Sequence, residues 1–163
     1  MRSATVVNLQ RKVSVDARSF SRFCETLFQT LEEARGKSVD IAFISDRRMK
    51  ELNSFFRGKD STTDVLSFPH EPDEFEGKSD AFTRDDEDTN NITPDGATPA
   101  FLGDIVISAE QAAIQSEENG LTLENEIKQL ILHGLLHLCG YDHETDNGEM
   151  NARELELRDK LGI

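Results

Sequence analysis

The sequence of 163 residues contains no tryptophan and only two cysteines, Cys24 and Cys139. Two cysteines cannot form the disulfide framework that stabilises many small secreted proteins. No run approaches about eighteen apolar residues, so we expect no transmembrane helix. The N-terminus has no apolar segment of the signal-peptide type. These absences indicate a cytoplasmic protein with no membrane partner, and the length suits one domain with its own core.

Basic residues are also scarce, because 18 Lys and Arg stand against 32 Asp and Glu and give a formal net charge of −14. Such a charge argues against bulk affinity for nucleic acid. Much of it comes from residues 71–100, where ten acidic residues stand against two basic ones, a net charge of −8. This segment lacks apolar periodicity and contains three of the four prolines. It predicts a flexible acidic insertion within a single domain that spans residues 1–163.

Apolar periodicity elsewhere predicts four strands and five helices. The strands are expected at residues 5–9, 38–45, 64–68 and 102–108. The helices are expected from Asp16 to Gly36, from about residue 46 to Gly58, at 109–119, from Thr122 to Cys139, and from about residue 146 onward. The resulting order, βαβαβ, insertion, βααα, predicts an α+β or α/β layer of about four strands with helices packed on it.

Several helix ends are marked by residues with suitable chemistry. The expected N-caps are Asp16, Ser108 and Thr122. In the short second helix, the spacing predicts that Leu52 and either Phe55 or Phe56 face the core. Gly140 is expected to end the helix that begins at Thr122.

The segment HGLLHLCGYDH, residues 133–143, contains three of the four histidines. His133 and His137 are four residues apart on an expected helix, so their rings project from one face. Gly140 permits a left-handed turn that can bring His143 back towards them. Three neutral imidazoles with an open fourth position are typical of a catalytic zinc site. We therefore expect one zinc ion per chain, held at the end of this helix by His133, His137 and His143.

The spacing of these histidines is that of the metzincin zinc helix, but one residue differs. Metzincins have Glu directly after the first histidine as the general base for peptide hydrolysis. Here that residue is Gly134. The metal scaffold is therefore predicted without the peptidase base. A small residue at this position instead allows another element, or a bulky substrate, to approach the metal closely.

Other residues near these segments are candidates with weaker signals. Arg57 follows a short basic helix, and its guanidinium matches phosphate oxygens as well as it suits a surface ion pair. Asp104 is a candidate acceptor for the second nitrogen of a ligand imidazole. Cys139 is a possible alternative ligand with a poorer spacing, Glu144 has no indicated direction, and His70 is expected to be an ordinary exposed histidine.

Three segments resemble the YbeY family of bacterial rRNA maturation factors. They are residues 133–143, ELNSFFRGKDSTTDVLSFP at 51–69, and LGDIVIS at 102–108. The resemblance implies an α+β fold with a mixed, mainly parallel sheet of four strands under helices. It also implies a zinc-dependent, single-strand-specific endoribonuclease that matures rRNA ends, notably of the small-subunit rRNA, and acts in ribosome quality control.

The resemblance assigns the metal ligands to His133, His137 and His143 and a functional role to Arg57. Its expected partners are single-stranded rRNA and the ribosome or small-subunit ribosomal proteins. The sequence alone leaves two alternatives open: a non-catalytic, zinc-stabilised ribosome assembly factor, and a metallopeptidase-like hydrolase with an unusual base. The identity of the general base is also undetermined by the sequence, because the nucleophile can be a zinc-bound hydroxide or the 2′-hydroxyl of RNA.

Overall fold

The computed structural model describes residues 3–71 and 100–163, and the acidic insertion predicted at 71–100 lies almost wholly outside these described residues. One mixed sheet forms the centre of the molecule, with the strand order β1-β2-β4-β3. Its strands are β1 (Ala4–Asn8), β2 (Lys37–Ile44), β3 (Val65–Pro69) and β4 (Ala100–Ser108). The β1–β2 and β2–β4 pairs are parallel, and β3 pairs with β4 in the antiparallel direction. The expected mixed, mainly parallel sheet of four strands is therefore confirmed.

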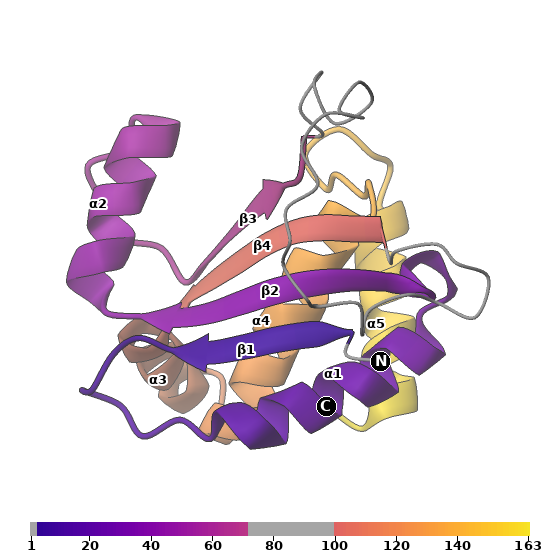
Figure 1. Cartoon of the computed structure of the whole chain (residues 1–163), viewed down its shortest axis with the longest axis horizontal. Coiled ribbons are helices and arrows are strands. Elements are labelled where there is room, and N and C mark those ends of the chain that lie inside the picture. Colours follow the sequence, from indigo (N-terminus) through magenta and orange to yellow (C-terminus); the bar gives the residue numbers. More distant parts are fainter. Residues whose placement is uncertain (1–2, 72–99) are drawn as a thin grey trace, which may run out of the picture.

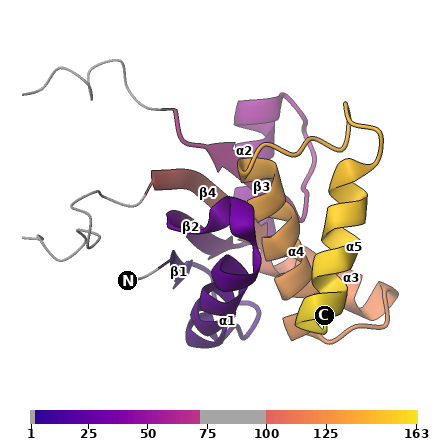
Figure 2. The ribbon, with the colours of Figure 1, turned by 90° about the vertical axis from the view of Figure 1, so that its right-hand side faces the viewer.

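Within the described residues, five α-helices accompany the sheet, in the predicted order along the chain. They are α1 (Ala17–Thr30), α2 (Asp46–Arg57), α3 (Ala109–Glu118), α4 (Leu123–Leu138) and α5 (Glu149–Leu161). Figures 1 and 2 show α1, α4 and α5 on one face of the sheet, while α2 projects from one end. Among the described residues, none of these helices is long and apolar enough to cross a bilayer.

The core lies between the sheet and the covering helices. Strand residues such as Ile41, Phe43 and Ile105 meet Leu132 and Leu136 of α4 in one buried cluster, and all five side chains have no exposed surface. Because α4 is apolar around much of its circumference, it is held from several sides, which fits a central buried helix. The histidines in its C-terminal half are thereby attached to a helix that is packed into the core.

The predicted N-caps are confirmed. Asp16 accepts hydrogen bonds from the backbone of the first turn of α1, and the Ser108 and Thr122 hydroxyls do the same for α3 and α4. The predicted end of the first helix at Gly36 is wrong, since α1 ends at Thr30. A short 3₁₀ turn, η1 (Glu32–Ala34), separates the two, and it places Glu33 on the surface towards α5.

The interior face of α2 differs from the prediction in its last turn. Met49 is fully buried and Asn53 is 2% exposed, and Asn53 Nδ2 donates to the carbonyl oxygen of Ser61 at 2.8 Å. Phe55 and Phe56 are 81% and 58% exposed, so neither faces the core. The amide of Asn53 occupies the buried position, and the last turn extends beyond the small apolar cluster around Met49.

Candidate metal centre and cleft

Three histidine side chains converge beyond the end of α4. His133 Nε2 and His137 Nε2 lie 3.2 Å apart, and His143 Nδ1 lies 3.2 Å from His137 Nε2. One nitrogen from each ring falls within 4.8 Å of the other two, a set that can hold a single ion. The structure thus brings together the three residues that the sequence motif singles out.

The local backbone explains this convergence. His133 and His137 are one helical turn apart on α4, so their rings share a face. Gly140 follows the helix with a φ of 101°, a conformation that L side chains rarely adopt, and the chain reverses there. His143, three residues later, is exposed and points back at the helix.

A carboxylate that the sequence analysis missed orients the first histidine. Glu154 Oε1 on α5 lies 3.2 Å from His133 Nδ1 and 3.4 Å from Arg158 Nη2. Burial raises the pKa of Glu154, but the hydrogen bond from His133 and the charge of Arg158 outweigh it and hold the pKa below its ordinary value. An ionised Glu154 accepts a hydrogen bond from the Nδ1–H of His133, and in this tautomer Nε2 carries the lone pair that faces the other rings.

The protonation of His137 also suits metal binding. Burial lowers the pKa of His137, and the neighbouring charges of His133 and His143 lower it further. The neutral imidazole is therefore favoured, and only this form has a lone pair to donate. Three imidazole nitrogens, with no fourth protein ligand among residues 3–71 and 100–163, match the donor set of catalytic zinc sites. The residues present fit the metal that the sequence predicts.

Gly134 has a clear packing role. A Cβ atom at this position would lie 3.0 Å from Ile105 Cγ2 and 3.1 Å from Ser67 Oγ. The Ser67 hydroxyl also donates to the Gly134 carbonyl oxygen at 3.2 Å. The glycine therefore lets α4 lie against β3 and β4. Its small size allows the close approach of another element of the fold, as one of the two sequence-based explanations predicts. The position where a metzincin has its general base faces the sheet and has no room for a carboxylate.

A cleft of about 800 Å³ contains the histidine cluster. It runs along β3, which is an edge strand of the sheet, and the loop of residues 140–144 forms the other side of the cleft. Arg57 and Lys59, at the end of α2, line the same cleft. Within the part of the chain that the structure describes, neither has an ion-pair partner, whereas Lys50 on the same helix pairs with Asp60 at 3.8 Å. The cleft therefore combines a possible metal site with two cationic side chains.

The acidic side chains of the cleft are Asp64, Asp142 and Glu144. Asp64 Oδ1 is held at the start of β3 by the backbone N–H of Val65 at 2.8 Å. Asp142 and Glu144 are exposed on the histidine loop. The protein's own charges therefore do not make the cleft strongly positive.

Two candidates from the sequence are placed elsewhere. Asp104 is exposed, and the side chain of the next residue, Ile105, faces α4. Because successive side chains of a strand point to opposite faces of the sheet, Asp104 lies on the face away from α4 and cannot reach the histidines. Cys139 packs against the core and does not belong to the histidine cluster. His70 is exposed as expected, and its ring contacts Phe101.

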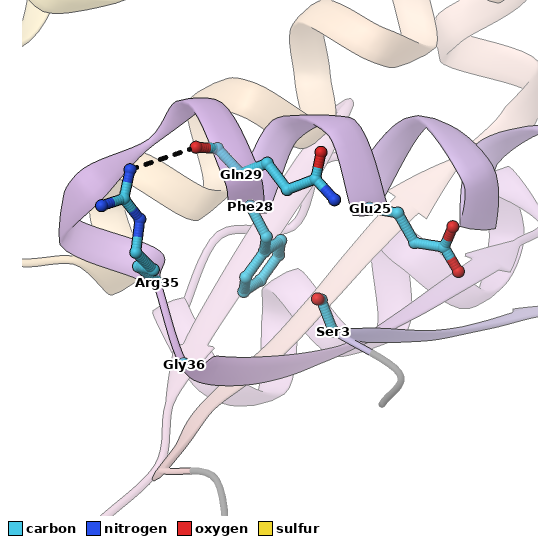
Figure 3. Close-up of a pocket in the computed structure, with 6 residues that line it drawn as sticks. All are labelled: Ser3, Glu25, Phe28, Gln29, Arg35 and Gly36. Atoms are coloured by element: carbon cyan, nitrogen blue, oxygen red, sulfur yellow. Dashed lines mark hydrogen bonds between the residues drawn. The ribbon is translucent and has the colours of Figure 1, made fainter.

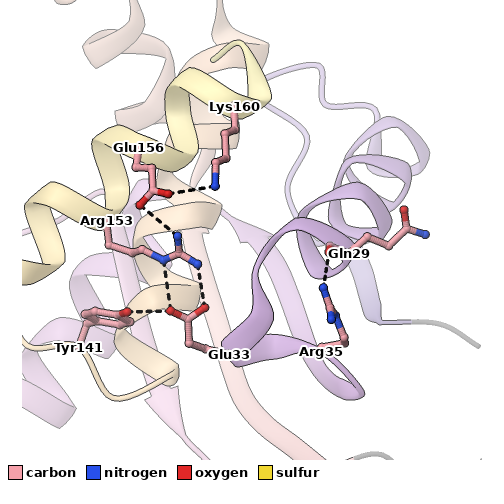
Figure 4. A network of polar contacts seen from close by, with 7 residues as sticks. All are labelled: Gln29, Glu33, Arg35, Tyr141, Arg153, Glu156 and Lys160. Atoms are coloured by element: carbon pink, nitrogen blue, oxygen red, sulfur yellow. Dashed lines mark hydrogen bonds and ion pairs between the residues drawn. The ribbon is translucent and has the colours of Figure 1, made fainter.

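The loop that carries His143 is tied to distant parts of the chain. The Tyr141 hydroxyl donates to Glu33 Oε1 at 2.7 Å, and Arg153 Nε and Nη2 donate to the two oxygens of the same carboxylate (Figure 4). Partial burial raises the pKa of Glu33, but these hydrogen bonds and the Arg153 charge lower it to about 2. One ionised carboxylate thereby joins η1, the histidine loop and α5.

Another cavity, of about 650 Å³, lies between α1 and the residues that immediately precede β1 and β2 (Figure 3). Its lining residues are Ser3, Glu25, Phe28, Gln29, Arg35 and Gly36. The Arg35 side chain donates to the Gln29 carbonyl oxygen at 3.4 Å. Because this cavity lacks a group of possible metal ligands, the histidine cleft is the stronger candidate for chemistry.

Comparison with known proteins gives a consistent result. The sequence model of a family described as Endoribonuclease YbeY matches residues 5–162. An Endoribonuclease YbeY of Nautilia profundicola is 44% identical over 128 residues, which cover 78% of this chain and 74% of the relative. One from a Thermoanaerobacter species is 37% identical over 159 residues, 94% of each chain. The solution structure of a Thermotoga maritima protein shares the fold, with a TM-score of 0.60 and 23% identity over 97% of this chain and 88% of that one.

Proposed function

This chain belongs to the YbeY family of endoribonucleases, and we propose that it is a zinc-dependent enzyme that cuts single-stranded rRNA. As a member of this family it is a metal-dependent endoribonuclease with a role in rRNA processing. The finer proposal concerns the metal, the substrate and the roles of individual residues. Its substrate is the 3′ end of the small-subunit rRNA, and its partners are the ribosome or small-subunit ribosomal proteins. The choice of the 3′ end rests on the family resemblance, and the cytoplasmic location rests on the composition of the sequence, which has only two cysteines.

In this proposal His133, His137 and His143 hold one zinc ion. When bound, zinc in such a site supplies Lewis-acid chemistry that activates water and stabilises negative charge on a phosphate. Glu154 keeps the Nδ1 proton on His133 and so directs Nε2 towards the ion. The buried helix α4 and the turn at Gly140 position the three rings close together before any ligand arrives.

Arg57 binds the phosphate group of the scissile bond in this account. It lines the same cleft as the histidines and has no ion-pair partner among the described residues, so its guanidinium is available to an anion. A guanidinium contacts two phosphate oxygens at once and stabilises the charge that builds up as the phosphodiester is cleaved. Lys59 adds a second cation near the same group.

The observation that carries the proposal is the placement of three converging imidazoles and Arg57 in one cleft. A peptidase has less support, because Gly134 leaves no room for the usual base. The test compares metal-free, zinc-loaded and nickel-loaded protein on a single-stranded rRNA fragment and on the same fragment annealed to its complement. We expect about one zinc per chain and cleavage of the single strand only. Equal cleavage before and after metal removal would refute the zinc dependence.

A further inference from the structure

A row of aromatic side chains leads out of the histidine cleft along α2. Phe68 on β3 and Phe56 on α2 both line the cleft, with ring centroids 5.0 Å apart. Phe55 continues the row, and its ring lies 4.8 Å from that of Phe56. Phe56 is 58% exposed and Phe55 is 81% exposed. Two adjacent phenylalanines in solvent bury too little area to stabilise the fold appreciably, so their role is sought in a contact with another molecule.

Cations flank this row on the side of the cleft. Arg57 directly follows Phe56, and Lys59 comes two residues later beyond the turn at Gly58. A line of exposed rings beside cationic side chains is the arrangement by which proteins bind single-stranded nucleic acid, with bases stacked on rings and phosphates near the cations.

The charge of the chain makes such stacking necessary. A net charge of −14, and the three carboxylates of the cleft, allow little affinity from phosphate contacts alone. Stacking on an aromatic ring does not depend on charge and is available to every unpaired base. In a duplex, the faces of the bases are already covered by their neighbours, so the same rings cannot hold it.

We infer that Phe55 and Phe56 form a stacking platform for the unpaired bases of the RNA strand that enters the histidine cleft. The inference rests on the proposed function and names the residues that select single strands. Phe56 stacks the base nearest the cleft and Phe55 the next one outward, while Arg57 holds the phosphate between them and the histidines. The ring of Phe68 meets that of Phe56 in an edge-on contact, with an interplanar angle of 63°.

The test measures steady-state cleavage of a single-stranded RNA by the full, zinc-loaded chain and by Phe55→Ala, Phe56→Ala and Phe56→Leu. Loss of one ring is expected to raise KM by about fivefold or more, while kcat stays within about twofold. Phe56→Leu keeps an apolar side chain but no ring face, so its KM also rises. Leu9→Ala, at a side chain that is 69% exposed on another part of the surface, serves as the matched control and leaves KM unchanged. Thermal unfolding of each variant verifies the fold.

A competition experiment separates stacking from other effects. For wild type, an unlabelled strand with abasic sites competes with the substrate less well than a normal strand, and this difference becomes smaller for Phe56→Ala, which keeps only the ring of Phe55. If wild type does not cut RNA, the proposed function and this inference both fail. If wild type cuts and the phenylalanine variants keep its KM, only the stacking platform is refuted. If they keep KM but no longer bind small ribosomal subunits, the platform is also refuted, and the rings contact a ribosomal protein instead.

Discussion

The Tyr141 hydroxyl donates a 2.7 Å hydrogen bond to Glu33, a residue 108 positions earlier in the chain. The same carboxylate accepts two hydrogen bonds from Arg153 on α5, at 3.2 and 3.1 Å. Tyr141 stands two residues before His143, in the loop that brings the third imidazole to the site. The position of that loop therefore depends on an ionised carboxylate outside the cleft.

Replacing Glu33 by Gln is expected to change how stability depends on pH. The folded-state pKa of Glu33, about 2, lies below the ordinary value of 4.5. The ionised carboxylate therefore stabilises the fold fully above about pH 4.5, and this contribution is lost as the pH falls towards 2. We expect wild type to lose about 1–2 kcal/mol more than Glu33→Gln between pH 5 and pH 3, since partial exposure weakens the pair. Urea unfolding at several pH values measures the difference.

The exposed neighbour Glu32 offers the matched control for this pH series. Its side chain has no ion pair in the described part of the chain, so Glu32→Gln should follow the wild-type pH dependence. The account of the loop is contradicted if Glu33→Gln and Glu32→Gln lose stability in parallel with wild type.

Replacing Glu154 by Gln is expected to weaken metal binding without unfolding the protein. The neutral amide oxygen accepts a weaker hydrogen bond from the Nδ1–H of His133 than the carboxylate does, so the ring is oriented less firmly. Losses of about 10–100-fold in metal affinity are typical for such outer partners. Competition with a chelating dye measures the affinity. Asp159→Asn, at an exposed position on the same helix, should bind zinc as wild type does.

Replacing Gly134 by Glu, which restores the metzincin sequence, should not produce a peptidase. The new side chain would collide with Ile105 and Ser67 and would place a charge against the sheet. We expect the free energy of unfolding to fall by about 3 kcal/mol or more. Asn125→Glu adds the same charge to the first turn of α4, where it is favourable, and should not destabilise the protein. Digestion of a peptide library by Gly134→Glu would show that our reading of this position is wrong.

Removing the metal is expected to lower the thermal stability. An ion that binds only the folded state adds about 4 kcal/mol at a thousand times its dissociation constant. Melting curves with zinc and with a chelator should therefore differ for wild type and coincide for His137→Ala. His70→Ala should keep the difference, because His70 lies outside the cluster. A difference that persists in His137→Ala would place the stabilising ion at another site.

Local chemistry made much of this fold predictable. The N-caps at Asp16, Ser108 and Thr122, and the turn at Gly140, each depend on a few neighbouring residues, and all four appear in the structure. The histidine cluster was also predictable, since one helical turn and one glycine determine most of its geometry.

The errors and omissions concern contacts between distant segments. Asp104 was misplaced, although its alternation with the buried Ile105 already indicates the opposite face. Glu154 was missed because 21 residues separate it from His133. One signal pointed to it: Glu154 shares a helical stripe with Met150 and Leu157, both buried, and a carboxylate on an apolar stripe needs a partner. The pairing of Glu33 with Tyr141 left no such sign in the sequence.

The measurement that tests the central claim most directly uses wild type, His137→Ala and Arg57→Ala, each assayed for bound zinc and for cleavage of a single-stranded rRNA fragment. The account predicts one zinc and cleavage for wild type, one zinc with cleavage reduced at least about 100-fold for Arg57→Ala, and neither zinc nor cleavage for His137→Ala. Equal cleavage by all three preparations would contradict it, because the activity would then come from elsewhere than this cleft.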